Sequence, residues 1–179
     1  LSGESAASSS NAARLVILQQ EAKRLNNNLI ELLTLYKIEN ERICANIEEL
    51  NVADFLEEVV AENRAIADAR RVALECSCDS DLFGYFDEGL LRGVINSLIG
   101  NGLRYTHSRL LLAAQQHDGY LVFRVEDDGE GFPQEMVEAQ QALGQSQPLS
   151  EGRTQLGIYF AGMVAAMHRN KGNKGFIRL

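Results

Sequence analysis

An apolar seam near the start of the chain sets the first limit on how it can fold. The residues of the seam follow one another at alternating steps of three and four: Leu15, Leu18, Ala22, Leu25, Leu29, Leu32 and Tyr36. This heptad spacing is typical of a helix packed in a coiled coil or a four-helix bundle. A helix over residues 11–39 would be about 43 Å long, more than one small globular domain can cover. The sequence therefore predicts a long dimerisation helix, with an ordinary amphipathic core helix as the alternative.

The segments on either side of this helix have a different composition. The first ten residues are rich in Ser, Ala and Gly and predict a loop that ends in a helix cap at Ser10 or Asn11. After residue 40 the heptad spacing stops. We therefore expect two parts, a dimerisation helix within residues 1–40 and a separate domain over residues 41–179.

Beyond residue 40 the apolar residues alternate between strand and helix periodicity. Asp87 is an expected helix cap, and His117-Asp118-Gly119 an expected hairpin turn. Residues 132–154 show little periodicity and predict a flexible segment. Strands are expected near residues 44–50, 72–78, 109–114, 120–126 and 175–179, and helices near 51–69, 87–104 and 156–168. This order predicts an α+β fold, a two-layer sandwich of helices on a mixed sheet.

Charge and composition narrow the class of ligand. The net charge of −8 argues against a nucleic acid as the main partner, because phosphate backbones are held by clustered Lys and Arg. A small anionic ligand remains compatible, since a few local donors can hold a nucleotide. No apolar run approaches the ~18 residues that span a bilayer, and no signal peptide opens the chain, so we expect this fragment in the cytoplasm. The three cysteines lack the spacing of a zinc or redox site and are expected to be structural thiols.

Three short motifs carry the candidate chemistry. The motif Asp127-Asp128-Gly129-Glu130-Gly131 follows a predicted strand, and its glycines let a ligand approach the backbone. Asn101 and Arg104 share a helix face, where an amide oxygen suits Mg²⁺ and a guanidinium suits a phosphate, while the ring of Tyr105 suits a base. Thr154-Gln155-Leu156-Gly157-Ile158 opens a helix, whose free N–H groups suit a phosphate. Singly, each motif also fits an ordinary acidic turn, helix end or helix start.

In this order and spacing, the motifs resemble the GHKL (Bergerat-type) ATP-binding fold, and in particular the catalytic domain of sensor histidine kinases. Residues 97–106 resemble the N box of these kinases, residues 127–131 the G1 box and residues 154–158 a partial G2 box. Residues 21–39 resemble the second helix of their dimerisation and phosphotransfer domain. The resemblance implies a protein-histidine kinase of two-component signalling that binds ATP and Mg²⁺. It also implies a homodimer through helix 11–39 and a response-regulator receiver domain as partner.

The resemblance assigns expected roles to the motif residues. Asn101 would ligate Mg²⁺, Arg104 would reach the phosphates and Tyr105 would cover the nucleotide. Asp127 would accept a hydrogen bond from the adenine amino group, and the glycines of the G1 box would make room for the base. Residues 132–155 would form the ATP lid. The residues implied to hold the nucleotide are Asn101, Arg104, Tyr105, Asp127, Gly129, Gly131, Arg153, Leu156 and Gly157.

Two of the boxes depart from the family pattern. Ser97 stands where the family has its first N-box asparagine, and Asn96 is one position out of register and is expected to face elsewhere on the helix. Arg153 and Gln155 occupy two glycine positions of the G2 box, so that Gly157 alone remains. The phosphate cradle is therefore expected to be weaker, or Arg153 to supply a charge in its place.

No histidine of the chain has the setting expected of a phosphoacceptor. His107, His117 and His168 are each expected to be surface or capping residues, and the acceptor is expected upstream of Leu1. The fragment alone is therefore expected to be inactive in autophosphorylation. GHKL ATPases such as gyrase carry a water-activating glutamate where this chain has Ser97, and a hydroxyl is a poor general base. Hydrolysis of ATP is therefore expected to be slow.

These observations favour one functional hypothesis and leave two others open. The leading one is a histidine kinase core that transfers the γ-phosphoryl of Mg-ATP to a histidine outside the fragment, by positioning and charge neutralisation. The alternative is a non-catalytic or phosphotransfer-only module that has lost ATP binding and recruits a response regulator. An anti-sigma serine kinase is the third, disfavoured by the long helix. Binding of ATP separates the first two.

Overall fold

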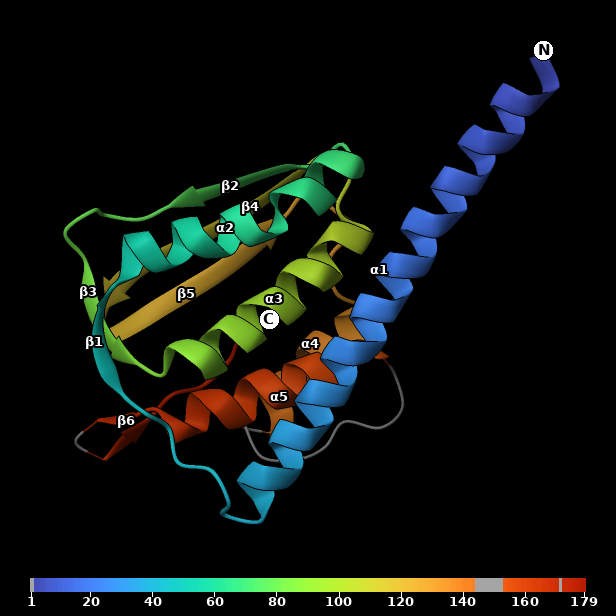
Figure 1. The fold of residues 1–179 in the computed structure, drawn as a ribbon. Coiled ribbons are helices and arrows are strands. Elements are labelled where there is room, and N and C mark those ends of the chain that lie inside the picture. Colours follow the sequence, from blue (N-terminus) through green and yellow to red (C-terminus); the bar gives the residue numbers. More distant parts are fainter. Residues whose placement is uncertain (1, 144–152, 171) are drawn as a thin grey trace.

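The computed structural model describes residues 2–143, 153–170 and 172–179. Side chains are described at residue 18 and from residue 21 onward, apart from 23, 139–155 and 171. Figure 1 shows a long helix leaning on a sandwich of helices and strands. The elements in chain order are α1 (Ser2–Glu39), β1 (Glu48–Asn51), α2 (Val52–Ala69), β2 (Ala73–Ser77), β3 (Phe83–Phe86), α3 (Glu88–Tyr105), β4 (Arg109–His117), β5 (Tyr120–Asp127), α4 (Gln134–Leu143), α5 (Arg153–Met167), β6 (Arg169–Asn170) and β7 (Asn173–Lys174).

The strands form a mixed arrangement. β2 pairs in parallel with β4, β4 pairs antiparallel with β5, and β1 and β3 form a separate antiparallel pair. The β4–β5 hairpin closes at His117 opposite Tyr120, through Asp118 (φ 49°) and Gly119 (φ 79°). Two successive residues at positive φ match the right-handed twist of the flanking strands, as the Asp-Gly pair predicts. The predicted hairpin is therefore confirmed.

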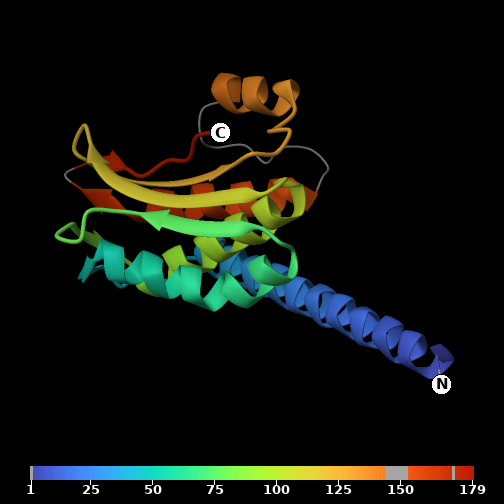
Figure 2. The same ribbon diagram turned by 90° about the horizontal axis from the view of Figure 1, so that it is seen from above.

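The helices form a layer against this sheet. Helices α2 and α3 cover one face of the strands, and α5 lies beside α3 (Figures 1 and 2). Between the layers, the rings of Phe55, Phe86 and Phe123 meet edge to face with centroids 5.1 to 6.1 Å apart. These rings belong to a core of buried aliphatic side chains that includes Leu56, Ile95 and Ile99. The predicted α+β sandwich of helices on a mixed sheet is confirmed.

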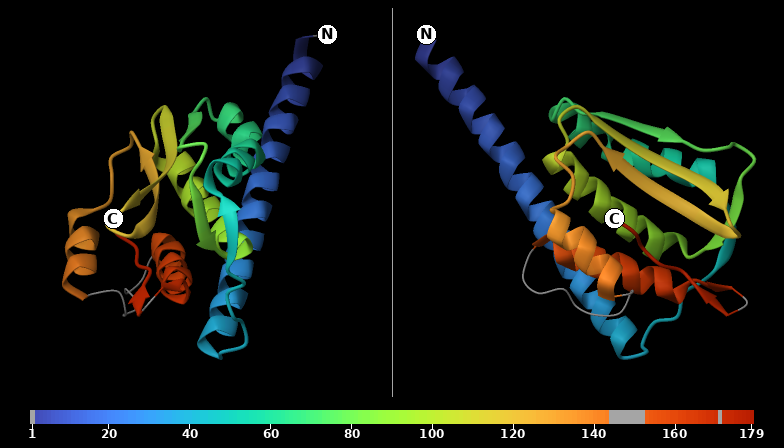
Figure 3. Two further views of the ribbon diagram at one scale, coloured as in Figure 1. Left: turned by 90° about the vertical axis from the view of Figure 1, so that its left-hand side faces the viewer. Right: turned by 180° about the vertical axis from the view of Figure 1, so that it is seen from behind.

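A second apolar cluster joins α1 to the sandwich. Its buried members come from α1, α3 and α5: Leu35, Leu90, Val94, Phe160, Ala161 and Val164. The Tyr159 hydroxyl of α5 donates to Glu39 Oε1 of α1 at 3.1 Å. The N-terminal part of α1 runs beyond the sandwich (Figure 3). Helix α1 is thus held to the domain by its C-terminal half.

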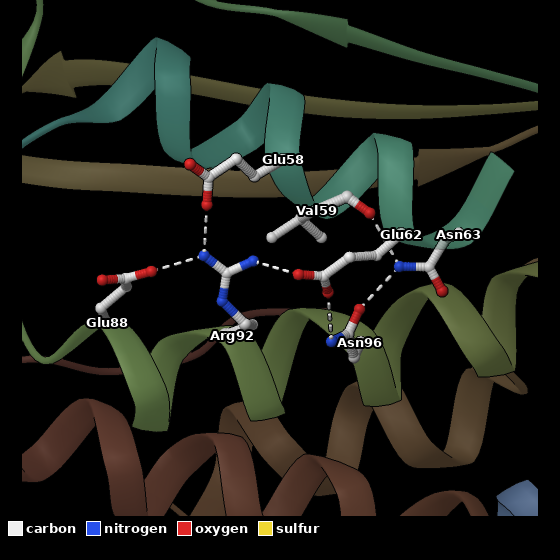
Figure 4. A network of polar contacts seen from close by, with 7 residues as sticks. All are labelled: Glu58, Val59, Glu62, Asn63, Glu88, Arg92 and Asn96. Carbon is white, nitrogen blue, oxygen red and sulfur yellow. Dashed lines mark hydrogen bonds and ion pairs between the residues drawn. The ribbon is translucent and has the colours of Figure 1, made fainter.

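A network around Arg92 ties α3 to α2 (Figure 4). The Arg92 guanidinium, 20% exposed, binds carboxylates at 2.5 to 2.8 Å on α2 and on its own helix: Glu58, Glu62 and Glu88. These carboxylates raise the pKa of Arg92 against the opposing effect of its burial. Beside it, Asn63 Nδ2 donates to Asn96 Oδ1 at 2.7 Å. Asn96 therefore faces α2, away from the other N-box side chains, as its register predicts.

Asp87 fixes the start of α3, and with it the position of the N box. Its Oδ1 accepts from the Leu90 N–H at 2.8 Å, so it is the helix cap that the sequence predicts. Its Oδ2 accepts from the Asn46 N–H in the connection after α1, at 2.7 Å. Its own N–H donates to His168 Nε2 at the end of α5, at 3.0 Å. One aspartate thereby joins three segments of the chain.

The prediction of a loop over the first ten residues was wrong. Helix α1 begins at Ser2, and Leu1 lies outside the described residues. Extending an existing helix adds one hydrogen bond for each residue that is fixed, so Ala, Ser and Glu residues can continue it at little cost. The predicted cap at Ser10 or Asn11 lies inside the helix.

Strand β3 and helix α4 were not predicted. Strand β3 has Gly84 on its buried side, where a Cβ would overlap the Leu121 side chain, and a glycine gives no apolar signal. Helix α4 lies within the predicted irregular segment, while residues 144–152 lie outside the described ones. The Pro133 carbonyl accepts from the N–H groups of Met136 (2.9 Å) and Val137 (3.3 Å). Proline at a helix start is the signal that could have revealed α4.

The predicted strand over residues 175–179 was also wrong. The short strands β6 and β7 pair just before it instead. The Gly175 N–H donates to the His168 carbonyl at 3.0 Å, and the Phe176 ring packs edge-on against Tyr120 of β5, with centroids 5.2 Å apart. Phe176 thus packs on the sheet and Ile177 on the second apolar cluster, and neither lies in a strand.

Candidate nucleotide-binding site

The centre of the candidate site is the contact between the C-terminal half of α3 and the first turns of α5. Ser97 and Asn101 lie four residues apart on one side of α3, and Gly157 of α5 is buried against them. A Cβ at Gly157 would stand 2.9 Å from the Ser97 hydroxyl oxygen and 3.4 Å from Asn101 Nδ2. A side chain at this position would displace the Ser97 hydroxyl, so the glycine permits the close approach and brings the N-box residues next to the G2-like helix start.

The G1 turn meets the end of the same helix. A Cβ at Gly129 would overlap the carbonyl oxygen of Tyr105, so only a glycine lets the two backbones come this close. The Gly129 N–H donates to Asp127 Oδ1 at 2.8 Å. Gly131 adopts a φ of 75°, in the left-handed region that favours glycine. The predicted N, G1 and G2 segments thus adjoin one another around α3.

Asp128 is a positioning residue that the sequence reasoning missed. Its carboxylate accepts from the hydroxyls of Thr106 (2.5 Å) and Ser108 (2.6 Å). It also accepts from the backbone N–H groups of His107 (2.9 Å), Ser108 (2.9 Å) and Arg109 (3.1 Å). These bonds, those of Ser108 above all, hold the pKa of Asp128 far below its ordinary value. Asp128 thereby ties the G1 turn to the loop after α3, although the D-x-G-x-G pattern treats this position as a spacer.

Arg104 and Tyr105 form an exposed pair at the last turn of α3. The Arg104 guanidinium carbon stands 5.7 Å from the centroid of the Tyr105 ring, within reach of a cation–π contact. The Tyr105 side chain is 55% exposed. The ring is therefore open to a ligand and is not part of the core, which was the alternative for this residue.

Of the remaining lid residues whose side chains are described, Leu156 is placed less favourably for contact with a ligand. Leu156 is half-buried and packs on the second apolar cluster. Arg153 opens α5, but its side chain lies outside the described ones, and so does that of Gln155. Whether Arg153 supplies a charge in place of a glycine therefore stays a prediction.

The three histidines lie at the surface or at the end of a helix. His168 Nε2 accepts from the Asp87 N–H at 3.0 Å, so Nδ1 carries the proton that reaches the Val164 carbonyl at 2.8 Å. His107 and His117 are exposed, in the loop after α3 and at the β4–β5 hairpin. None lies on the long helix α1, in agreement with the capping and surface roles expected.

One further carboxyl reaches the site from α1. Glu31 is 6% exposed and lies beside Ser97 of α3. Burial raises the pKa of Glu31, and the hydrogen bond of Ser97 opposes that effect. The heptad analysis gave no sign of this residue, because it lies off the a/d seam.

Over the described residues, one hollow lies away from the candidate site. A hollow of about 380 Å³ lies on β2, β4 and β5, beside Cys78 and Arg124, and none of the candidate site residues lines it. Over the described residues, no cluster of three or more His, Cys, Asp or Glu side chains is placed to bind a metal. No helix in that part of the chain has the length and apolar character needed to cross a membrane.

Residues 86–174 match the family of histidine kinase-, DNA gyrase B- and HSP90-like ATPases. This range contains Asn101, Asp127 and Gly157 together with the elements that position them. The chain therefore carries a domain of that ATPase family. Within the family its relatives are sensor histidine kinases, and the chain belongs with them as a GHKL-type member.

The relatives differ widely in sequence. The sensor histidine kinase RppB of Synechocystis sp. is 21% identical over 159 residues, which cover 85% of this chain and 35% of RppB. The signal transduction histidine-protein kinase AfsQ2 of Streptomyces coelicolor is 26% identical over 161 residues, covering 88% of this chain and 29% of AfsQ2. The chain thus spans about a third of the length of these curated relatives.

Two solved structures share the fold. The histidine kinase AdeS of Acinetobacter baumannii superposes with a TM-score of 0.66 at 22% identity, over 88% of this chain and 78% of that chain. Full-length ShkA in complex with AMPPNP gives a TM-score of 0.67 at 19% identity, over 87% of this chain and 34% of that one. At these identities the likeness establishes the fold alone.

Proposed function

We propose that this chain is the kinase core of a sensor histidine kinase that binds Mg-ATP and delivers the γ-phosphoryl to a histidine outside the fragment. The observation that carries the proposal is the meeting of Ser97, Asn101 and Gly157 at one point, with the G1 turn packed on the end of the same helix. In this assignment Asp127 accepts from the adenine amino group, and Tyr105 and Arg104 cover the nucleotide and reach its phosphates.

The residues at this point fit a magnesium ion. Mg²⁺ prefers oxygen ligands and keeps several waters, so one amide oxygen and the phosphates of the nucleotide suffice to hold it. Asn101 would provide that oxygen, and its side chain and the Ser97 hydroxyl both lie beside Gly157. The ion supplies neutralisation of the charge that develops on the phosphates. ShkA, which shares this fold, was solved in complex with AMPPNP, and that structure supports a nucleotide at such a domain.

The site favours transfer over hydrolysis. Ser97 offers a neutral hydroxyl at the position where a carboxylate would activate water. Catalysis then rests on holding the γ-phosphoryl in line with its acceptor. His107, His117 and His168 have surface or capping positions and none lies on α1. The acceptor in this proposal is therefore a histidine upstream of Leu1.

Helix α1 is proposed to form the homodimer. The large side chains of its a/d seam that the structure describes are 51% to 64% exposed: Leu18, Leu25, Leu29, Leu32 and Tyr36. The sandwich is bound by the other side of the helix, through Leu35. An apolar seam left free along a helix suits a partner helix of a bundle. The domain division into 1–40 and 41–179, a response-regulator receiver domain as partner and a cytoplasmic place of action belong to the same proposal.

The rival function is a module that recruits a response regulator without binding ATP. The specific observation in its favour is the pair Arg153 and Gln155, which replaces two glycines of the G2 box. The test is labelling with γ-labelled ATP, on the fragment and on a longer chain that includes the preceding helix. We expect label on the longer chain alone. Label on the fragment would show that the acceptor is misplaced, and an unlabelled longer chain that carries the histidine would favour the rival.

A further inference from the structure

Three exposed apolar side chains lie on β3 and at the start of β1. Outside α1, the large apolar side chains that the structure describes as exposed are those of Ile47, Phe83, Tyr85, Tyr105 and Phe132. Tyr105 ends the N box and Phe132 follows the G1 box. Ile47 instead directly precedes β1, and Phe83 and Tyr85 belong to β3. We call Ile47, Phe83 and Tyr85 the aromatic patch, which lies at the end of the sandwich away from the N-terminal part of α1 (Figures 1 and 3).

The pairing of β1 with β3 points both rings of the aromatic patch outward. The residues that alternate with them on β3 are buried, so Phe83 (53% exposed) and Tyr85 (67% exposed) face solvent. Phe83 lies opposite Asn51. Tyr85 lies opposite Glu49, and its hydroxyl donates to Glu49 Oε1 at 2.6 Å, which holds the ring in place.

The stability of the domain does not account for these rings. Cross-strand pairs stabilise a sheet when aromatic or β-branched side chains meet, whereas each ring here lies opposite a polar side chain. An aromatic side chain gains its large apolar burial only when another surface covers it. Grouped exposed apolar side chains mark a contact surface, and aromatic residues are enriched in such surfaces.

The surroundings of the aromatic patch are acidic. Residues 44–63 and 72–91 contain its strands, and neither segment has a Lys, Arg or His. Exposed carboxylates lie near both ends of the two strands, on Glu48, Asp54, Asp79 and Asp81. Arg124, which lines a hollow together with Asp79, pairs with Glu126 at 3.4 Å and does not reverse this charge. A basic partner is therefore complementary to this surface, whereas an anionic membrane or a nucleic acid would be repelled.

We propose that the aromatic patch binds a basic segment of a partner protein. The cationic heads of its Arg or Lys side chains lie over the faces of Phe83 and Tyr85, where the ring quadrupole attracts them. Their aliphatic stems cover Ile47 and the rings, and the surrounding carboxylates steer the approach. Helix α3 begins at Glu88, just after β3, and the candidate nucleotide site lies at its C-terminal half. The aromatic patch is thus separate from that site, and both can be occupied at once.

The test is binding of a short fluorescent peptide of alternating Arg and Ala residues, followed by anisotropy at low salt. We expect saturable binding to the wild type that weakens as salt rises, and no binding of a matched peptide with Glu in place of Arg. The double variant Phe83→Thr and Tyr85→Thr should weaken binding by about tenfold, because both cation–π contacts are lost. Threonine suits an exposed strand position, so circular dichroism and ATP affinity should stay as in the wild type.

Two variants serve as controls. Tyr85→Phe keeps the ring and should retain most of the peptide affinity, and Ile30→Thr changes an exposed apolar residue of α1 and should have no effect. Equal affinity in the wild type and the double variant would show attraction by net charge alone and would overturn the proposal, as would a wild type that does not bind the peptide.

Two further results would assign the aromatic patch to another occupant and overturn the proposal. Equal binding of a peptide with Gln in place of Arg would indicate an apolar partner. Self-association of the wild type that the double variant loses, with peptide affinity unchanged, would indicate a second copy of this chain.

Discussion

Asp128 shows how much of the site depends on one residue that touches no proposed ligand. Five donors from residues 106–109 converge on its carboxylate. They join the loop after α3 to the turn that carries Asp127 and Gly129. The geometry of the G1 box is thus set by the spacer position of its own motif.

Replacing Asp128 with Ala should loosen both segments. Three backbone N–H groups and two hydroxyls would lose their acceptor, so we expect Tm to fall by several degrees and ATP affinity to fall with it. Asp128→Asn keeps one acceptor oxygen and should have a smaller effect. The control is Glu126→Ala, which removes an exposed carboxylate two residues earlier, on β5. If Asp128→Ala matches this control in Tm and affinity, the carboxylate has no positioning role.

The contribution of Asp128 also depends on pH. Folding lowers the pKa of this carboxyl from its ordinary value of 3.8. A carboxyl with a lowered pKa stabilises the fold above its ordinary pKa, and this stabilisation is lost as the pH falls below that value. The Tm difference between the wild type and Asp128→Ala should therefore be large at neutral pH and shrink in acid. A difference that stays constant with pH would contradict the assignment.

At the scale of whole elements, helix α3 was predictable because its signals are local. Asp87 marks its start, apolar periodicity marks its buried side, and Asn101 and Arg104 mark its polar end. The α1 seam was predictable for the same reason. Contacts between distant segments left no such signal: Asp128 bonds to Ser108 twenty residues earlier, and Glu31 meets α3 from another helix.

The elements that were missed or wrongly predicted also lack a clear local signal. Strand β3 is short and carries Gly84 at a buried position, so its alternation is hidden, and α4 follows Pro133 within a segment of weak periodicity. The C-terminal residues were read as a strand because they are apolar, but Phe176 packs on Tyr120 without one. Apolar periodicity indicates which residues are buried, whereas tertiary contacts determine whether those residues lie in a strand, in a helix or in neither.

The burial of the Glu31 carboxyl between α1 and α3 should cost stability at neutral pH. Burial raises the pKa of Glu31 above its ordinary value of 4.5, so the folded protein holds the proton more tightly than the unfolded chain. The cost is absent below that ordinary pKa and appears as the pH rises through the raised one. Glu31→Gln should therefore raise Tm at about pH 8 and less so at about pH 5. A variant less stable than the wild type at both values would contradict this.

At the scale of the whole molecule, α1 presents two separate apolar surfaces. One packs on α3 and α5 through Glu31, Leu35 and Ile38, and the other presents the a/d seam. The two sides do not share residues, so a partner helix and the sandwich can be bound at once. The long helix is therefore suited to connect a dimer to its nucleotide sites.

Charged residues in the seam should separate the dimer without harming the domain. Replacing Leu25 and Leu29 with Glu places four like charges in a two-fold interface, and we expect monomers that still bind ATP. Ile30→Glu changes an exposed apolar residue of α1 outside the seam and should leave the dimer intact. Light scattering that finds the unmodified fragment monomeric at high concentration would show that the seam needs another partner.

The most direct test of the central claim is a calorimetric titration of Mg-ATP into the wild type, Asp127→Asn, Asn101→Ala and Asn96→Ala. The account predicts one ATP per chain. Asp127→Asn should lose about 1–3 kcal/mol of binding free energy through a mismatched hydrogen bond to adenine. Asn101→Ala should lose affinity in Mg²⁺, whereas Asn96→Ala, which faces α2 on the same helix, should bind as the wild type does. Equal affinity in the wild type and Asp127→Asn, or no binding of ATP by the wild type, would contradict the account.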